Sequence, residues 1–408
     1  MASPVLYQAY LAQCDLVAPT RAMASLAVRA LESVPVGLAG NPLIRSLSAG
    51  NEFIARAGFT HRRPAFGIPT VQMGERQVAV HEEAAAVTPF GTLLHFVKDD
   101  QVPQPRVLLV APLSGHFATL LRATLRTLLP EHDVFITDWH NARDVPVEHG
   151  PFGLDDYTEH VMRFLEVLGP AHVIAVCQPC VPVLAAVALM ADASNPAVPK
   201  SLTLMAGPID TRINPTKVNE LAMAKPLSWF EQNLITKVPA RHAGKGRPVY
   251  PGFLQLTAFM NMNLARHVRA HLGLFNDLAL GRVAEAQATK DFYDEYFAVL
   301  DMTAEFYLET IRFVFQEHCL PRGTLAYRGR VVDPRVITRT ALLTVEGAND
   351  DICAPGQTLA AHDLCSGLKT YRKRHHLQPG VGHYGVFSGR RWESQIYPIV
   401  QNFILANE

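Results

Sequence analysis

The stretch AHVIAVCQPCVPVLAAVALM, residues 171–190, limits what the chain can fold into more than any other segment. Its β-branched and apolar residues run up to Cys177 and stop there, and a second apolar stretch begins at Cys180. Short apolar runs on either side of such a break are typical of a buried strand, a sharp turn and a buried helix. The sequence therefore predicts a strand, turn and helix with a nucleophilic thiol at the corner.

Such a corner is typical of the nucleophile elbow of the α/β-hydrolase fold, which reads small-x-nucleophile-x-small because neighbouring backbone crowds the turn. Here Ala175 and Pro179 flank Cys177 at those positions. Proline replaces the expected glycine, and it is compatible with the first turn of a helix, whose N–H groups lack helical partners. The alternative is a buried structural cysteine, because unpaired Cys is among the most buried residue types.

Composition narrows the classes of protein that the chain can represent. With 408 residues, 49% of them hydrophobic and 18% charged, the chain can bury a large core. Its 37 basic residues equal its 37 acidic ones, so overall charge does not favour nucleic-acid binding. The N-terminus lacks a secretory pattern, and the longest apolar block, residues 181–191, is too short to span a bilayer. We expect a cytoplasmic protein without a membrane span.

The spacing Cys177-x-x-Cys180 raises the question of a metal or redox site. No second pair of Cys or His residues at ligand spacing accompanies it in the sequence, so we expect no bound metal. Cys180 lies about one helical turn after Cys177 and is predicted to be structural.

Strand and helix signals alternate through the middle of the chain. We expect strands at residues 78–81, 92–97, 106–111, 133–137, 171–176, 201–205, 341–345 and 370–374, and helices at 117–129, 154–168, 253–271, 291–315, 356–365 and 393–405. The first two strands read as an antiparallel pair. The alternation after them predicts right-handed βαβ units in a mostly parallel, doubly wound sheet.

The regular alternation lapses between about residue 207 and residue 330. This interval reads as an inserted cap over the strand ends, where open α/β sheets bind ligands. The predicted organisation is a helical extension at 1–62, a core made of 63–208 and 330–408, and a cap at 209–329. Pro35 and Pro42 break the extension into separate helices, which we expect to pack against the core.

An acid and a base follow Cys177 in the chain order that this fold uses. A Gly-x-x-Asp phrase ends at Asp350 after the predicted strand at 341–345, and His383 lies between glycines after the last predicted strand. We assign His383 as general base and Asp350 as the carboxylate that orients it, with Asp351 as the rival acid. Taken singly, such residues can belong to turns or helix caps. Their order and spacing relative to Cys177 favour a triad.

The predicted oxyanion hole consists of two backbone N–H groups. One belongs to Gln178, which follows the nucleophile, and the other to Leu113, with Ser114 as the alternative. His116 in the same loop is predicted to contact substrate, or else only to cap the loop or pack within it. A Cys–His nucleophile attacks an ester to form a thioester, so the predicted chemistry is acyl transfer from an ester or thioester.

Six segments spread over the chain carry a family resemblance: LYQAYLAQCDL, VAPLSGHFATLLR, TDWHNARDVPVEHGPFGLDDY, AVCQP, VEGANDDICAPGQT and GVGHYGVFSGRRW. In these segments the chain resembles the intracellular polyhydroxyalkanoate (polyhydroxybutyrate) depolymerases of bacteria. The resemblance implies a hydrolase with the triad Cys177, Asp350 and His383. It also implies a cytoplasmic location on granules of amorphous storage polyester, from which the enzyme releases 3-hydroxybutyrate or its oligomers.

A polymer substrate gives the inserted cap a role. Phe253, Phe259 and Met260 are predicted to contact substrate in a channel or at the granule surface, and the alternative is that they form the core of the cap. The basic residues between Arg212 and Arg269 suit a solvated face, contact with an anionic surface, or binding of the phosphates of coenzyme A as acyl acceptor. No other cofactor is expected. The sequence leaves the oligomeric state open, a homodimer included.

Two other functions compete with this interpretation. Polyhydroxyalkanoate synthases resemble the same family and use the same three residue types, but they usually keep Gly around the nucleophile, where this chain has Ala175 and Pro179. The second alternative is a granule-associated protein without catalysis. The complete set of Cys177, Asp350 and His383 favours an enzyme.

Overall fold

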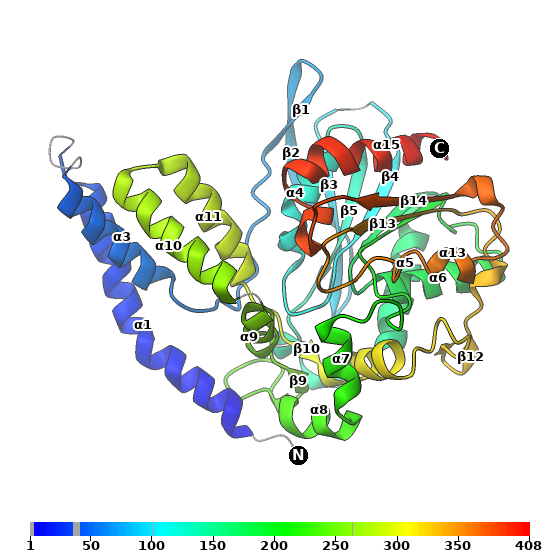
Figure 1. The fold of residues 1–408 in the computed structure, drawn as a ribbon, viewed down its shortest axis with the longest axis horizontal. Helices are drawn as coiled ribbons and strands as arrows, with labels where there is room; N and C mark the ends of the chain where they lie inside the picture. The colour runs from blue at the N-terminus through cyan, green and yellow to red at the C-terminus, as the bar shows by residue number, and fades with distance from the viewer. Residues whose placement is uncertain (1–3, 36–40, 101, 263) are drawn as a thin grey trace.

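The structure, a computed structural model, describes residues 4–35, 41–100, 102–262 and 264–408 of the chain. A nine-stranded sheet forms its centre (Figure 1), with the strand order β1-β2-β3-β5-β4-β6-β7-β13-β14. These strands are β1 (Thr70–Met73), β2 (Arg76–Val87), β3 (Gly91–Lys98), β4 (Arg106–Val110), β5 (Asp133–Trp139), β6 (His172–Val176), β7 (Ser201–Met205), β13 (Ala341–Gly347) and β14 (Lys373–Gln378).

The sheet has an antiparallel part and a parallel part. β1, β2, β3 and β5 pair antiparallel in that order, whereas β5, β4, β6, β7, β13 and β14 run parallel. β4 lies between β5 and β6, so the strand order reverses beside it, and open α/β sheets bind ligands at such a point. This topology confirms the predicted α/β-hydrolase fold with its mostly parallel, doubly wound sheet.

Helices cover both faces of the sheet because its central strands are apolar on both sides. The helices packed there include α4 (Arg122–Leu128), α5 (Leu154–Leu168), α6 (Cys180–Asp192), α13 (Ala361–Leu364) and α15 (Tyr397–Leu405). Val107 and Leu109 of β4 belong to the core on the side of α4 and α15, and Leu108 and Val110 belong to the core on the side of α5 and α6. Since side chains alternate along a strand, the continuous apolar runs in the sequence mark burial on both faces.

An inserted region lies between β7 and β13. It contains α7 (Lys217–Ala224), α8 (Leu227–Leu234), β8 (Thr236–Lys237), β9 (Pro248–Tyr250), α9 (Gly252–Met262), α10 (Leu264–Leu280), α11 (Val283–Tyr296), β10 (Met302–Thr303), α12 (Ala304–Glu309), a π-helical turn (Thr310–Gln316), β11 (Ala326–Tyr327) and β12 (Arg330–Val331). β10, β9 and β8 form a small three-stranded sheet of their own. The boundaries of a cap at 209–329 stay a prediction.

The predicted helix at 253–271 corresponds to α9 and the first part of α10, with residue 263 between them outside the described part of the chain. Another predicted helix of this region was wrong. The predicted helix at 291–315 is interrupted after α11, because Met302 pairs with Tyr250 in the small sheet. The buried carboxylate of Asp301 stabilises this extended segment, since it accepts hydrogen bonds from the Gly252 N–H and the Tyr7 hydroxyl.

Near the C-terminus the bounds of two further predicted elements differ from those in the structure. The predicted strand at 370–374 begins late, because residues 370–372 form a 3-10 turn before β14. Residues 356–365 are mostly turns, with only α13 helical. The physical reason is Glu346, whose buried carboxylate accepts the N–H groups of Gly356, Thr358 and Leu359 and so bends this segment around itself.

The remaining short elements are 3-10 turns and single π-helical or α-helical turns. They are η1 (Ala118–Leu121), η2 (Ala142–Asp144), η3 (Val147–His149), η5 (Pro334–Val336), η6 (Thr370–Arg372), η7 (His383–Val386), α14 (Gly389–Arg391) and η8 (Trp392–Ile396). The predicted helix at 117–129 consists of η1 followed by α4, and the one at 393–405 consists of η8 followed by α15.

The N-terminal helices α1 (Pro4–Glu32) and α3 (Pro42–Arg56) pack against each other and extend from the body of the molecule (Figure 1). α3 also packs on α10, and Tyr7 of α1 is buried with Val249 and Phe253. The extension therefore packs largely on the inserted region, which differs from the predicted packing against the core. No helix in the described ranges is both long and apolar enough to cross a bilayer.

Candidate active site

Cys177 lies at the sharp turn between β6 and α6, as the sequence predicts. Its φ angle is +68°, a left-handed conformation that is strained for any residue other than glycine. The turn is held because the Cys177 N–H donates a hydrogen bond of 2.8 Å to the carbonyl oxygen of Met205 at the end of β7. The half-buried thiol therefore stands at the carboxyl end of the sheet, beside the point where the strand order reverses.

The small residue that the elbow requires is Gly207, in the loop that follows β7. A Cβ atom on Gly207 would lie 2.2 Å from Cys180 Cβ and 2.3 Å from Cys180 Sγ, so only glycine fits beneath the turn. Cys180 is fully buried, and its thiol donates to the carbonyl oxygen of Ala175 at 3.4 Å. Burial raises the pKa of Cys180 well above its usual value. The requirement for Gly207 was missed because it depends on a contact between segments that are distant in sequence.

Replacing Gly207 with Ala is expected to destabilise the protein by about 1–3 kcal/mol, the usual cost of forcing extra volume into a packed site. It should also lower esterase activity, since relief of the overlap with Cys180 would shift the elbow. Thermal unfolding and initial rates would measure both effects. Gly50→Ala is the matched control, because nothing lies within 4 Å of the added Cβ there and the position is helical. Equal stability of the two variants would contradict this account of the elbow.

Asp350 and His383 meet in the loops that follow β13 and β14. His383 Nδ1 lies 2.8 Å from Asp350 Oδ2, and the other oxygen of Asp350 accepts the N–H groups of Ile352 and Cys353. Both side chains are almost fully buried. Asp351, the rival acid, is exposed and is not the residue that contacts His383 through this hydrogen bond.

Backbone contacts bring these two loops together. The Ala348 N–H donates to Gln378 and the Asn349 N–H donates to Val381, both at 2.9 Å. Gly347 permits this close approach, because a Cβ there would lie 2.6 Å from the Val381 carbonyl oxygen. Gly347, which precedes the predicted acid, thus serves the packing of the two loops.

The ring of His383 also interacts with Cys177. Burial alone would lower the pKa of His383, but the Asp350 carboxylate and the Cys177 sulfur attract the imidazolium and accept its hydrogen bonds, so the pKa is raised well above 6.5. The structure therefore brings together Cys177, His383 and Asp350. Chemically, an imidazole in this position can take a proton from the thiol while the carboxylate holds the ring.

The predicted oxyanion donors belong to the loop after β4 and to the residue that follows Cys177. The Leu113 N–H points toward the elbow and makes a long hydrogen bond of 3.4 Å to Oε1 of the Gln178 side chain. Within the described residues no protein group accepts the backbone N–H of Gln178, and its side-chain Nε2 is buried without a partner. Ser114 lies next to Leu113, and its backbone interacts with the ring of His116. The Gln178 side chain thus provides an oxygen near the place that a substrate oxyanion would need.

The four residues predicted to bind substrate have different surroundings in the structure. Phe259 lines a cavity of about 740 Å³ beside His383, which we call the His383 cavity. His116 is 2% exposed and stacks behind Phe259, so it packs the loop and does not line the cavity. Met260 lines a different cavity, described below. Phe253 is buried against Tyr7 and Tyr10 and is not available to substrate, because the N-terminal helix covers it.

His116 gives the site a pH-dependent element. Burial lowers the pKa of His116 from 6.5 to about 4. The unfolded chain therefore takes up the proton first, and stability falls as the pH drops from about 6.5 toward about 4, by at most about 3 kcal/mol for this group. Urea unfolding of His116→Phe should show a shallower loss of stability across this range than the wild type. Parallel curves for the two proteins would refute the assignment.

No group of three or more His, Cys, Asp or Glu side chains that could hold a metal ion occurs in the part of the chain that the structure describes. Cys180 Sγ faces backbone carbonyl oxygens of Ala175 and Met205, in keeping with a packing role.

The sheet topology, with a nucleophile-type elbow after β6 and an acid and a histidine after β13 and β14, defines an α/β-hydrolase. Residues 206–408 match the family model described as PHB de-polymerase C-terminus, so the chain belongs to the polyhydroxybutyrate (PHB) depolymerase family. Fold and family together define an ester hydrolase. No curated protein matches the chain in sequence.

Solved structures similar in fold include three bacterial or biosynthetic hydrolases. A putative lipase of Acinetobacter baumannii is 14% identical with a TM-score of 0.44, covering 81% of this chain and 93% of its own. A 2-hydroxy-6-oxo-6-phenylhexa-2,4-dienoate hydrolase of Rhodococcus sp. strain RHA1 is 12% identical with a TM-score of 0.44, covering 80% and 99%. The thioesterase domain of the curacin biosynthetic pathway is 12% identical with a TM-score of 0.43, covering 80% and 99%. Identities this low carry no information on activity.

Proposed function

We propose that the chain hydrolyses ester bonds of a storage polyester with Cys177 as nucleophile, His383 as general base and Asp350 as the residue that orients His383. The observation that carries the proposal is the 2.8 Å contact between His383 and Asp350 beside the left-handed Cys177. A base held by a carboxylate next to a nucleophile at a sharp turn is the arrangement that nucleophilic acyl transfer needs.

The first half of the reaction forms a thioester. His383 Nε2 takes the proton of the Cys177 thiol, and the sulfur attacks the ester carbonyl carbon. The carbonyl oxygen becomes an oxyanion, which the N–H groups of Gln178 and Leu113 stabilise once it displaces the Gln178 side-chain oxygen. When the intermediate collapses, the C–O bond breaks and the alcohol leaves with the proton from His383.

The second half returns the enzyme to its starting state. His383 removes a proton from water, and the resulting hydroxide attacks the thioester carbon. The C–S bond breaks, the acid is released, and the Cys177 sulfur regains its proton from His383. Asp350 holds the ring and stabilises its protonated form in both halves.

The proposed substrate is amorphous poly-3-hydroxybutyrate, cleaved to 3-hydroxybutyrate or its oligomers on cytoplasmic granules. Membership of the PHB depolymerase family supports this choice. The aromatic side chains of Phe259, Tyr296 and Tyr384 in the His383 cavity also suit an uncharged chain with a methyl group on each unit.

Release of 3-hydroxybutyrate from native amorphous granules tests this function. The wild-type protein should release it, and p-nitrophenyl butyrate should be cleaved as well. Cleavage of the small ester without release from granules would reject the polymer as substrate and leave a small-molecule esterase. Formation of polymer from 3-hydroxybutyryl-coenzyme A would instead favour the synthase alternative.

Coenzyme A is proposed as an alternative acyl acceptor to water. Arg266, Arg390 and Arg391 line the His383 cavity, where they could meet the phosphates of the cofactor. If so, granules incubated with the protein and coenzyme A should yield 3-hydroxybutyryl thioester, detectable by mass spectrometry. A rate and product distribution unchanged by coenzyme A would leave water as the acceptor.

A further inference from the structure

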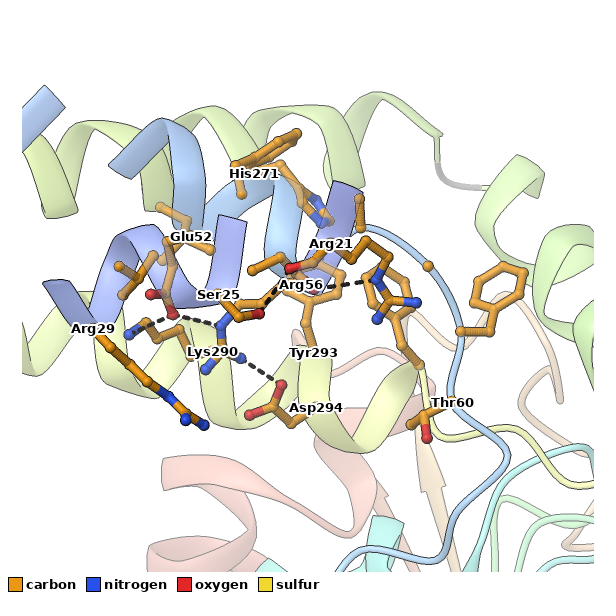
Figure 2. A pocket seen from close by; sticks show the side chains of 18 of the residues that line it. Arg21, Ser25, Arg29, Glu52, Arg56, Thr60, His271, Lys290, Tyr293 and Asp294 are labelled. Carbon is orange, nitrogen blue, oxygen red and sulfur yellow. Dashed lines mark hydrogen bonds and ion pairs between the residues drawn. The ribbon is translucent and has the colours of Figure 1, made fainter. Parts of the chain in front are cut away.

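A second cavity, of about 740 Å³, lies between the N-terminal helices and the helices of the inserted region (Figure 2). Its walls come from α1, α3, α9, α10 and α11 and from the chain that follows α3. Neither Cys177, His383 nor Asp350 lines it. We call it the Arg21 cavity, after one of the side chains that line it.

Most of the surface inside the Arg21 cavity is apolar. The apolar and aromatic side chains there include Val28, Phe53, Phe59, Met260, Leu274 and Phe297. Concave sites of this size that combine an apolar wall with a few polar groups are typical of small-molecule binding. An apolar chain of a ligand would replace water along this wall, which is favourable in proportion to the area covered.

Four of the charged side chains in the cavity neutralise one another. Arg56 pairs with Glu52 at 2.6 Å and with Asp294, and Lys290 pairs with Glu52 at 2.8 Å. Figure 2 shows these side chains together on one side of the cavity, bridging α3 and α11. They hold the wall in place and leave no net charge to attract a ligand.

Arg21 is different, because no carboxylate pairs with it among the residues that the structure describes. Its Nε donates to the carbonyl oxygen of Ala55 at 3.2 Å. The guanidinium lies over Gly58, where φ is +121° and an added Cβ would come within 3.1 Å of Nη1. Glu32, an acid at the far end of α1, is about 16 Å away along the helix axis. The remaining N–H groups of Arg21 are therefore free of an acidic partner.

We propose that the Arg21 cavity binds an amphipathic carboxylate. The carboxylate would accept two parallel hydrogen bonds from the Arg21 guanidinium, the geometry that Arg favours over Lys, and the apolar chain would lie along Phe59 and Phe297. Carboxylate-ended oligomers of a polyester belong to this chemical class, but the proposal does not depend on the function proposed above. Tyr293 lines both this cavity and the His383 cavity, so the two sites share a wall.

Decanoate is a suitable probe, observed through the ε-methyl group of Met260 in a protein labelled with ¹³C at its methionine methyls. Met260 lines the Arg21 cavity and is absent from the lining of the His383 cavity, so its signal reports on the right site. Met260→Leu identifies the signal. The Met260 signal should shift on titration, and Arg21→Gln should weaken decanoate binding at least tenfold. Decanol, which lacks the charge, should also bind at least tenfold more weakly than decanoate.

Arg29→Gln is the matched control, because Arg29 lies on the same helix and lines the cavity but is exposed, and its loss should change affinity less than threefold. Ser25→Phe fills the cavity and keeps Arg21, so it should abolish the shift of the Met260 signal with decanoate. This variant tests the proposal if Arg21→Gln fails to fold. Equal binding by wild type and Arg21→Gln, or no shift of Met260, would overturn the proposal. Neither result bears on ester hydrolysis, since the measurement involves no turnover.

Discussion

Cys177→Ala should lower kcat/KM for ester hydrolysis by about 10⁴-fold or more, because the variant has no atom that can form the thioester. The fold should persist, since Ala fits wherever Cys does and the turn is held by backbone contacts to Met205. Activity on p-nitrophenyl butyrate and on granules, together with thermal unfolding, would measure both properties. The kcat/KM of Cys177→Ser should fall between that of Cys177→Ala and that of the wild type, because the serine hydroxyl is a weaker nucleophile in the same place.

Cys14→Ala is the control for loss of a thiol, since Cys14 is the other half-buried cysteine of the described chain and lies on α1. Its activity should match that of the wild type. A folded Cys177→Ala protein that retains full activity would place the nucleophile elsewhere. If the wild type itself turned over no ester, the alternative of a granule-associated protein without catalysis would gain support.

The parts of the fold that follow from short segments were accessible from the sequence. Leu154–Leu168 and Ser201–Met205 form the predicted helix and strand, because each carries its periodicity and its end signals within its own length. The elbow at Cys177 was predictable for the same reason. So was the order of the acid and the histidine, since each follows a strand directly in the chain.

The parts that depend on contacts between distant segments were not accessible. Gly207 is required only because the end of β7 passes beneath the elbow, and Asp301 interrupts a predicted helix only because Tyr7 and Gly252 reach it in three dimensions. The prediction that Phe253 contacts substrate rests on its apolar character alone. Its burial against Tyr10 could not be read from either helix separately.

Loss of the Asp350 carboxylate should also have a large effect on activity, because Asp350 orients His383. Asp350→Asn is expected to lower kcat by about 10²- to 10⁴-fold, because an amide can present N–H to His383 and so favour the wrong tautomer of the ring. Asn can still accept the N–H groups of Ile352 and Cys353, so the loop should keep its shape. Asp351→Asn is the matched control, with less than a threefold change expected, since Asp351 is exposed and Asp350 makes the hydrogen bond to His383.

Asp350→Asn should also change how the free energy of unfolding depends on pH, which a purely structural role of Asp350 would not do. In the wild type the pKa of His383 is raised above 6.5, so its ion pair with Asp350 stabilises the folded state fully below pH 6.5, and this contribution is lost as the pH rises through the folded-state pKa. Asp350→Asn removes the attraction and lowers the pKa of His383. The variant should therefore lose more stability at pH 6 than at alkaline pH, as measured by urea unfolding. A loss that is constant with pH would show that Asp350 only holds its loop, and Asp351 would then have to be tested as the acid.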